Sequence, residues 1–259
     1  MLTKWLLAPA LAILFALGAV GSSGAGDWST IRIGTEGVYA PFSYRDAAGR
    51  LSGFDIDIAQ ALCDRIGAKC SFVTLPYDGM IPALQNGQID LVDASMSITE
   101  KRRKVVDFVD RYYTRYARFL SCTAPPVGDA GPGAMKGRPI GTQAGTVNDD
   151  YLEAVYKESD LRLYKSMDEA YQDAAAGRLD AVLAGEAVSY AFMQSEAGKG
   201  CKFVSERVVD DRFYGGGVGM ALRKTDGDLR DKLNAALKQI LADGTYAAIN
   251  KKYFPFSIY

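Results

Sequence analysis

Short apolar runs alternate with amphipathic segments along most of this chain, and that alternation restricts its fold more than any other feature. Runs with the length of buried strands occur at 31–34, 71–75 and 89–92, and segments with helical periodicity at 55–66 and 79–86 separate them. Strands and helices in alternation predict a mostly parallel sheet covered by helices. The first part of the chain is therefore predicted to be an α/β unit.

A second series of the same kind follows a surface loop rich in proline and glycine at 123–137. Ser166 and Glu169 have the spacing of a capping box, which marks the start of a helix. The predicted strands are 139–141, 161–164, 179–183 and 202–204, and the predicted helices are 149–158, one from Ser166 and one from Glu186. The series predicts a second α/β unit.

The last part of the chain contains a predicted strand at 218–223 and helices at 228–241 and 245–253. It is too short for a third domain, so we expect it to pack on the first unit. The chain would then cross between two lobes twice, near 112–116 and near 213–217. The predicted division is lobe 1 at 26–114 and 214–259, and lobe 2 at 115–213.

The first 25 residues are predicted to be a signal peptide. Lys4 precedes an apolar run at 5–20, and small residues up to Ala25 offer a cleavage site. A membrane anchor is the alternative, but Pro9 interrupts the run and no basic stop-transfer patch follows it. We therefore expect export to the periplasm with cleavage after Ala25.

Charge and residue usage exclude several classes of function. The chain has 30 basic and 31 acidic residues and no histidine, and its near balance of charge disfavours nucleic acid or an anionic membrane as partner. Without histidine, Ser-His and Cys-His triads, imidazole zinc sites and the commonest general base are excluded. A binding protein for a small solute is favoured over an enzyme, with no metal and no cofactor.

Two motifs that suggest ligand sites have simpler interpretations. The glycine run at 215–219 lacks the Gly-Lys-Ser/Thr ending of a phosphate loop, so it is interpreted as a hinge or a segment of close backbone approach. Asp55 with Asp57 and Asp149 with Asp150 fall in first turns of predicted helices, where acids complement the helix dipole. No calcium loop surrounds these acids.

The four cysteines fit an oxidising compartment. Cys63 and Cys70 lie at the end of a helix and the start of the next strand, close enough to be bridged. Such a bridge would leave Cys122 and Cys201 as a second pair. Four buried free thiols are the alternative.

Candidate ligand contacts lie just after the first strand. Loops at the carboxyl ends of strands are where open α/β sheets bind ligands, and Glu36 and Tyr39 hold such positions. A carboxylate beside an aromatic ring suits a cation. Tyr39 and Tyr77 are candidates to hold a flat or cationic group between their rings, although packing in the core or at its rim is an equally good interpretation of both.

The segment around Arg102 suggests an anion site. Ser95 and Ser97 follow a strand end, and Arg102 falls in the first turn of a helix, where a cation is unfavourable unless an anion accompanies it. A ligand carboxylate gripped by both guanidinium nitrogens would provide that anion. A surface ion pair with Glu100 or Asp107 is the alternative.

The turn at 143–146 precedes another predicted helix. Free backbone N–H groups at such a helix start suit a carboxylate. An ordinary helix cap is the alternative interpretation.

Several separated motifs resemble those of the periplasmic solute-binding proteins of family 3. They are Ile33–Phe42, Gly53–Ile58, Ser95–Arg102 and Asp243–Phe256. Within the family, they are similar to the polar amino-acid and opine branch, which includes lysine/arginine/ornithine, histidine, octopine and nopaline binding proteins. The resemblance covers nearly the whole chain after the signal peptide.

The resemblance implies a two-lobed type II periplasmic binding fold that closes over an amino acid or opine. It also implies an ABC permease in the inner membrane as partner, a monomeric state, no cofactor, and a disulfide between Cys63 and Cys70. By the same resemblance, Arg102 and the N–H groups at Thr146 hold the ligand carboxylate, and Glu36 meets its distal cation. The implied ligand-binding residues are Glu36, Tyr39, Tyr77, Ala94, Ser95, Ser97, Arg102, Gln143, Thr146, Val147, Gly185 and Glu186.

Two positions depart from the family pattern. The family usually places an aspartate for the ligand's α-ammonium where this chain has Gly185, and Val147 replaces a frequent threonine. A buried ammonium without a carboxylate would lose a charge-assisted bond. Glu186 or Asp93 would have to replace the aspartate, or the ligand would lack a primary α-ammonium, as opines do.

Two other functions use the same scaffold. A dehydratase is related to these binding proteins, and in such an enzyme Glu36, Asp93 or Glu186 would act as a general acid with a pKa raised by burial. A sensory module that presents the ligand state to a membrane receptor is the other. Only the dehydratase would turn its ligand over.

Overall fold

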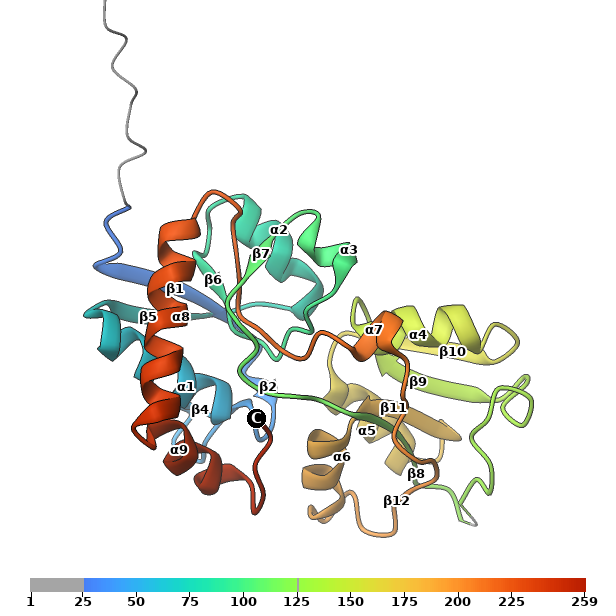
Figure 1. Ribbon diagram of the computed structural model, residues 1–259. Coiled ribbons are helices and arrows are strands. Elements are labelled where there is room, and N and C mark those ends of the chain that lie inside the picture. Colours follow the sequence, from blue (N-terminus) through green and yellow to red (C-terminus); the bar gives the residue numbers. More distant parts are fainter. Residues whose placement is uncertain (1–25, 125) are drawn as a thin grey trace, which may run out of the picture.

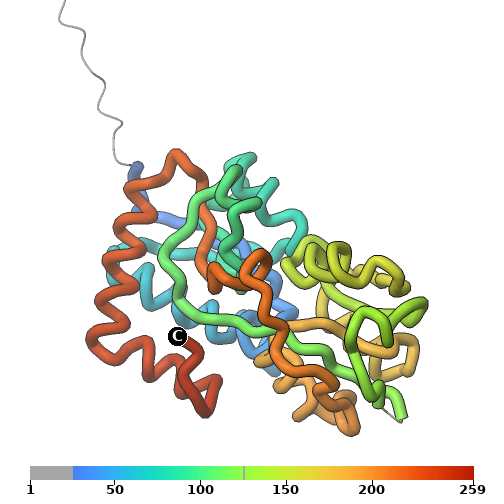
Figure 2. The backbone as a smooth tube through the Cα atoms, turned by 45° about the vertical axis from the view of Figure 1, so that its right-hand side comes forward, coloured from blue at the N-terminus to red at the C-terminus, as the bar shows by residue number. Residues whose placement is uncertain are grey.

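The computed structural model of this protein describes residues 26–124 and 126–259. The predicted signal peptide, 1–25, lies outside the described residues. Two α/β lobes lie side by side, and two extended segments, green and orange in Figure 1, connect them. Figure 2 shows the same two segments running together from a second direction. The chain therefore crosses between the lobes twice.

The sheet of lobe 1 takes strands from both ends of the chain, in the order β5-β1-β6-β13-β7. β5 and β6 run parallel to β1, whereas β13 is antiparallel to both β6 and β7. The strands are β1 (Thr30–Thr35), β5 (Lys69–Thr74), β6 (Leu91–Val92), β7 (Asp107–Phe108) and β13 (Ala221–Leu222). Because β13 is a central strand, the C-terminal part of the chain completes lobe 1.

The sheet of lobe 2 is built from one continuous stretch of chain, in the order β10-β9-β11-β8-β12. β10 and β11 are parallel to β9, and β8 is antiparallel to β11 and to β12. The strands are β8 (Ala117–Ser121), β9 (Pro139–Gln143), β10 (Asp160–Tyr164), β11 (Ala181–Gly185) and β12 (Lys202–Phe203). This topology supports the proposed division into lobes.

Helices cover the faces of both sheets (Figure 1). In lobe 1 they are α1 (Phe54–Ile66), the 3-10 helix η1 (Tyr77–Gly79), α2 (Met80–Gln85), α3 (Glu100–Arg103), α8 (Gly227–Ala242) and α9 (Thr245–Tyr253). In lobe 2 they are α4 (Val147–Val155), α5 (Met167–Ala175), α6 (Glu186–Met193) and α7 (Asp211–Tyr214). Lys252 and Tyr253 both bond to the carboxylate of Asp57, which fixes α9 to the start of α1.

Glycines let the second crossing segment lie against the backbone of lobe 1. A Cβ at Gly216 would be 2.1 Å from the carbonyl oxygen of Ile98, and Val218 forms β-bridges with Ser97 and Tyr113. The run is thus a segment of close approach, one of its two predicted interpretations. The strand predicted at 218–223 is wrong in length, because Val218 pairs with these other residues and β13 starts only at Ala221.

A three-stranded sheet that the sequence did not predict supports the aromatic turn. It consists of β2 (Val38–Tyr39), β3 (Ser43–Arg45) and β4 (Leu51–Ser52). The carbonyls of Pro41 and Phe42 accept hydrogen bonds from the backbone N–H groups of Phe54 and Asp55, at 3.0 and 2.9 Å. This turn therefore caps α1, whose N-cap residue Gly53 has no side chain to do so.

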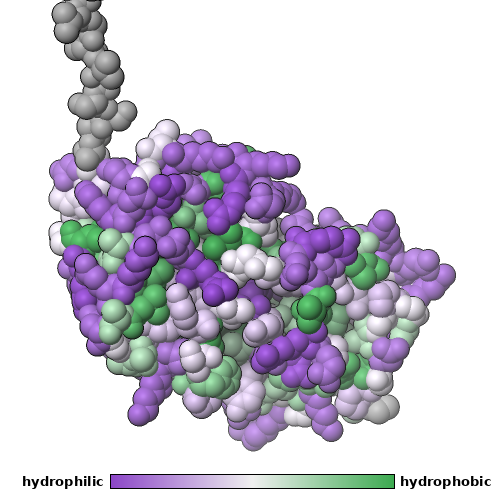
Figure 3. All heavy atoms as spheres, viewed as in Figure 1, coloured by the Kyte–Doolittle hydropathy of each residue, from purple (hydrophilic) through white to green (hydrophobic). Residues whose placement is uncertain are grey.

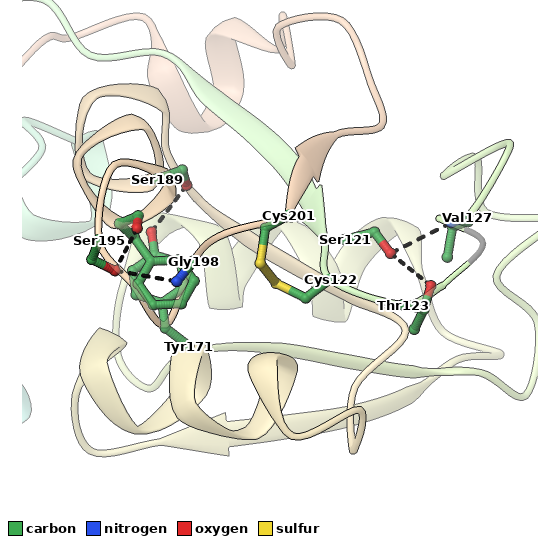
Figure 4. Close-up of a disulfide and its surroundings, with 10 residues drawn as sticks. Ser121, Cys122, Thr123, Val127, Tyr171, Ser189, Ser195, Gly198 and Cys201 are labelled. Atoms are coloured by element: carbon green, nitrogen blue, oxygen red, sulfur yellow. Dashed lines mark hydrogen bonds between the residues drawn. A yellow bond between two sulfur atoms is a disulfide. The ribbon is translucent and has the colours of Figure 1, made fainter.

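All four cysteines are paired, as predicted. Cys63 bonds to Cys70, which ties α1 to β5, and Cys122 bonds to Cys201. Figure 4 shows the second bridge beside Ser121, where it links the end of β8 to the residue before β12. The two bridges brace different lobes.

The face of the molecule in Figure 3 is mostly hydrophilic over both lobes, with hydrophobic residues in small separate patches. Large exposed hydrophobic side chains such as Val105, Leu163 and Val209 come from different parts of the chain. Within residues 26–124 and 126–259, no helix is both long enough and apolar enough to span a bilayer.

Replacing Gly53 by alanine is expected to lower the free energy of unfolding by more than about 3 kcal/mol. Gly53 has φ 137°, and a Cβ there would be 2.1 Å from the carbonyl oxygen of Phe42. Gly67, at the other end of α1, also has positive φ but nothing within 4 Å of a Cβ, so Gly67→Ala should cost only about 1 kcal/mol. Urea unfolding measures both, and equal losses would contradict the capping role of the turn.

Candidate ligand-binding site between the lobes

The predicted ligand-binding residues meet where the two lobes face each other. Three polar contacts join the lobes at this place: Gln143 Nε2 donates to Glu36 Oε1 at 2.6 Å, Arg102 Nη2 donates to the carbonyl of Gly145 at 3.1 Å, and Lys101 pairs with Asp150 at 2.7 Å. The residues come from segments after β1, β5, β6, β9 and β11, at the carboxyl ends of the strands. The structure therefore shows the closed arrangement of the lobes.

Arg102 is a buried cation with no counter-ion among residues 26–124 and 126–259. Its side chain is largely covered, Nη1 donates to the carbonyl of Ser97 at 2.7 Å, and its guanidinium lies 5.7 Å from the ring centre of Tyr77. None of the ion pairs in the described part of the chain includes it, and Asp107 pairs with Arg103 and Arg230 instead. Carbonyl dipoles compensate a buried charge only in part, so this guanidinium has capacity for an anion.

The start of α4 faces Arg102 with free donors. Thr146 is the N-cap: its hydroxyl accepts from Asp149 N and donates to the carbonyl of Gln143 at 2.8 Å. Gly145 N–H already donates to Asp149. The N–H groups of Thr146 and Val147 have no acceptor among the described residues. Helix N-termini with free N–H groups bind carboxylates, so the lobe 2 wall complements the guanidinium of lobe 1.

Glu36 lies in an acidic environment. Burial raises its pKa to about 7, the hydrogen bond from Gln143 opposes that rise, and the negative charges of Asp168, Asp55 and Asp78 add to it. These groups make the surroundings of Glu36 electronegative. A ligand cation that reached Glu36 would relieve the repulsion and favour its ionised form.

The two predicted aromatic walls are both buried, Tyr39 with 8% and Tyr77 with 6% of its surface exposed. The ring of Tyr39 packs on Phe42, with centroids 5.9 Å apart. The hydroxyl of Tyr77 has no hydrogen-bond partner among the described residues. The ring of Tyr77 is in cation–π contact with the guanidinium of Arg102.

The serine turn after β6 is held in a constrained shape. Ser95 has φ 52°, and its hydroxyl donates to Asp55 at 2.8 Å. This hydroxyl is therefore engaged inside lobe 1 and its hydrogen is not available to a ligand. Ala94 beside it is buried. Ser97 offers its carbonyl to Arg102 and its hydroxyl to Arg115, the latter at 3.4 Å.

Sequence reasoning missed the group that supports this turn. Tyr112 Oη donates to Asp55 Oδ1 and is also within bonding distance of Asp93 Oδ1, at 2.9 and 3.0 Å. Burial raises the pKa of Asp55 to about 7, and burial together with the charge of Asp55 raises the pKa of Asp93. Asp93 is 0% exposed, so it has no surface with which to receive an ammonium in place of the expected aspartate.

Glu186 cannot take that role either. Its carboxylate pairs with Arg118 at 3.2 Å and with Arg207 at 2.7 Å, and both partners belong to lobe 2. A Cβ at Gly185 would lie 3.5 Å from Arg115 Nη2. A cation, Arg115, therefore lies beside the position where the resemblance predicts an acid. Arg115 belongs to the first crossing segment, and the sequence did not single it out.

The comparisons with known proteins cover both lobes. Residues 31–256 match the profile of the bacterial extracellular solute-binding proteins, family 3. The chain is 38% identical over 253 residues to the lysine/arginine/ornithine-binding periplasmic protein of Escherichia coli (strain K12), over 96% of this chain and 97% of that protein. An ancestral arginine-binding protein bound to arginine has a TM-score of 0.81 and 36% identity, over 87% of this chain and 98% of the other.

A further solved structure bears on the enzymatic alternative. An ancestral amino acid-binding protein, a precursor of cyclohexadienyl dehydratase, has a TM-score of 0.78 and 33% identity, over 87% of this chain and 96% of the other. This neighbour is itself described as a binding protein. The comparisons therefore show a binding-protein family.

Asp93→Asn is expected to flatten the pH dependence of stability. Both buried carboxyls hold protons in the folded state that the unfolded chain releases above pH about 4, so the free energy of unfolding of the native protein should fall as pH rises from about 4 to 7. The variant has no carboxyl at position 93 to hold a proton, so the slope should be smaller. Unfolding measured across this range tests the prediction, with exposed Asp64→Asn as control, and an unchanged slope would contradict the raised pKa of Asp93.

Proposed function

This chain belongs to the bacterial extracellular solute-binding proteins, family 3, and we propose that it captures a cationic amino acid, or an opine derived from one, between its two lobes. The named relative binds lysine, arginine and ornithine, and the ancestral neighbour holds arginine. These likenesses support the ligand class, and the site of this chain supports it independently.

One observation carries the proposal: the guanidinium of Arg102 lies between the lobes without a counter-ion. The free N–H groups of Thr146 and Val147 face it from lobe 2. A ligand carboxylate would accept bonds from both sides, and charge-assisted bonds of this kind are strong. We infer that this is where the α-carboxylate of the solute binds.

The distal end of the solute is assigned to Glu36. Asp78 and Asp168 make its environment negative. Tyr39 is near it, since burial and then the charge of Glu36 both raise the pKa of Tyr39. A guanidinium or ammonium on a flexible side chain would pair with Glu36 and displace its bond to Gln143. A neutral side chain would leave the electronegative surroundings uncompensated.

Closure of the lobes follows from these assignments. The carboxylate contacts come from Arg102 in lobe 1 and Thr146 in lobe 2, so a bound solute stabilises the closed state more than the open one. We propose that the closed, loaded protein is an exported monomer in the periplasm that delivers its solute to an ABC permease. The same closure would serve a sensory receptor.

The dehydratase alternative rests on the raised pKa of Glu36 and of Asp93. Glu36 accepts a bond from Gln143, and Asp93 is fully buried behind the serine turn. A general acid must reach the substrate to donate its proton, and neither of these carboxyls faces open space in the cleft. We therefore propose a binding protein without turnover, and an assay of product formation from prephenate or arogenate separates the two.

Arg102→Ala is expected to weaken binding of every carboxylate solute at least about 100-fold, because a buried charge pair is lost. A thermal-shift screen of arginine, lysine, ornithine, histidine, glutamine, octopine and nopaline identifies the solute first, since a bound ligand raises the melting temperature. Calorimetry then compares the variants. Arg103→Ala, an exposed neighbour on α3, is the control and should bind normally. Normal affinity in Arg102→Ala would refute the assignment.

Affinity for a cationic solute should rise with pH through the pKa of Glu36. That pKa is about 7 in the closed form without solute, so below it the carboxyl is protonated and must release its proton to pair with the cation. Calorimetry at pH 5.5 and 8 should show tighter binding at the higher pH. Glu36→Gln should lose both affinity and this pH dependence, and a variant that keeps the pH dependence would contradict the role of Glu36.

A further inference from the structure

Arg115 is a second cation at the cleft, and nothing in the proposed carboxylate or side-chain contacts uses it. It lies in the first crossing segment, partly exposed, and lines a cavity of about 250 Å³ together with Tyr39, Gly185 and Glu186. Its Nη1 is 3.4 Å from the hydroxyl of Ser97. This contact is long, so it compensates little of the charge.

The described part of the chain provides no counter-ion for Arg115. No ion pair there includes it, and Glu186, the acid on the same cavity, is bound by Arg118 and Arg207. A guanidinium stays charged at any physiological pH. The wall at Gly185 is therefore positive where an amino-acid receptor needs a negative group.

Arg102 and Arg115 converge on a single residue. Arg102 donates to the carbonyl of Ser97, and Arg115 approaches the hydroxyl of the same residue. Two anionic groups on one small molecule could therefore pair with the two cations. A single α-carboxylate would satisfy only one of the two guanidinium groups.

The cavity provides room for such a second group. Gly185 has no side chain, and a Cβ there would already be 3.4 Å from the hydroxyl of Tyr39 and 3.5 Å from Arg115 Nη2. The space runs from this glycine along the first crossing segment to Phe256 and Ile258. A substituent on the α-nitrogen of the solute would enter it.

We propose that Arg115 is a specificity-determining residue that binds a second carboxylate, carried by a substituent on the α-nitrogen of the solute, in the cavity beside Gly185. The inference rests on the proposed function, in which Arg102 holds the α-carboxylate. The solute class is an N-carboxyalkyl derivative of a cationic amino acid. A free amino acid brings an α-ammonium to the same place, where Arg115 repels it.

The test compares two probes that differ only in the nitrogen substituent: arginine and octopine, which is arginine with a 1-carboxyethyl group on its α-nitrogen. Calorimetry on the native protein should show octopine binding at least about tenfold tighter than arginine. N-α-ethylarginine fills the same space without the charge and should not share this advantage. Arginine binding as tightly as octopine would overturn the inference.

Variants separate the charge of Arg115 from its neighbours. Arg115→Gln should remove most of the octopine advantage while leaving arginine binding equal or tighter, because the repulsion of the α-ammonium is gone. Arg207→Gln, on the same cavity but paired with Glu186, should keep the preference for octopine. Equal loss for both probes in Arg115→Gln would indicate a structural role and overturn the inference.

The results distinguish a wrong role for Arg115 from a wrong proposed function. If arginine binds and depends on Arg102 but octopine does not bind, the proposed function stands and the role of Arg115 is refuted. If neither probe nor any solute of the screen binds, the proposed function itself fails.

Discussion

One contact that joins the two lobes is made by a cation, the guanidinium of Arg102, which has no counter-ion among the described residues. It reaches from α3 to the carbonyl of Gly145 in the other lobe and also donates to the carbonyl of Ser97, and both of these partners are neutral. A buried cation of this kind has a desolvation cost that carbonyl dipoles offset in part. In the proposed function an anionic solute would complete the compensation, which would couple the free energy of closure to the free energy of binding.

The rest of lobe 1 holds this charge in place. The turn that carries Ser95 and Ser97 is fixed from behind by Asp55, which in turn shares Tyr112 with Asp93. These polar groups are buried in lobe 1 and hydrogen-bonded to each other. Replacing one of them would therefore change the shape of the serine turn. Asp55, in the first turn of α1, therefore connects the start of this helix to the turn that carries Ser95 and Ser97.

Much of the site was predictable, because residues after strand ends in an α/β sheet gather at one edge. Glu36 was predicted on that ground, Arg102 from its place in the first turn of a helix, and Gln143 from the turn before another helix. The structure brings all three to the lobe interface. Arg115 was not predicted, because its segment has no periodicity and its neighbours come from β2 and β11 through tertiary structure alone. The short sheet of β2, β3 and β4 was missed for a similar reason. Strands of two or three residues are too short to show the alternation of apolar and polar residues by which a strand is predicted.

The place of β13 between β6 and β7 in the lobe 1 sheet has a consequence for folding. Lobe 2 is encoded by one uninterrupted stretch, so its core can form without the C-terminal part of the chain. The sheet of lobe 1 cannot be completed until β13 is available to pair with both of its neighbours. The cleft between the lobes is therefore finished only after this late strand has been synthesised.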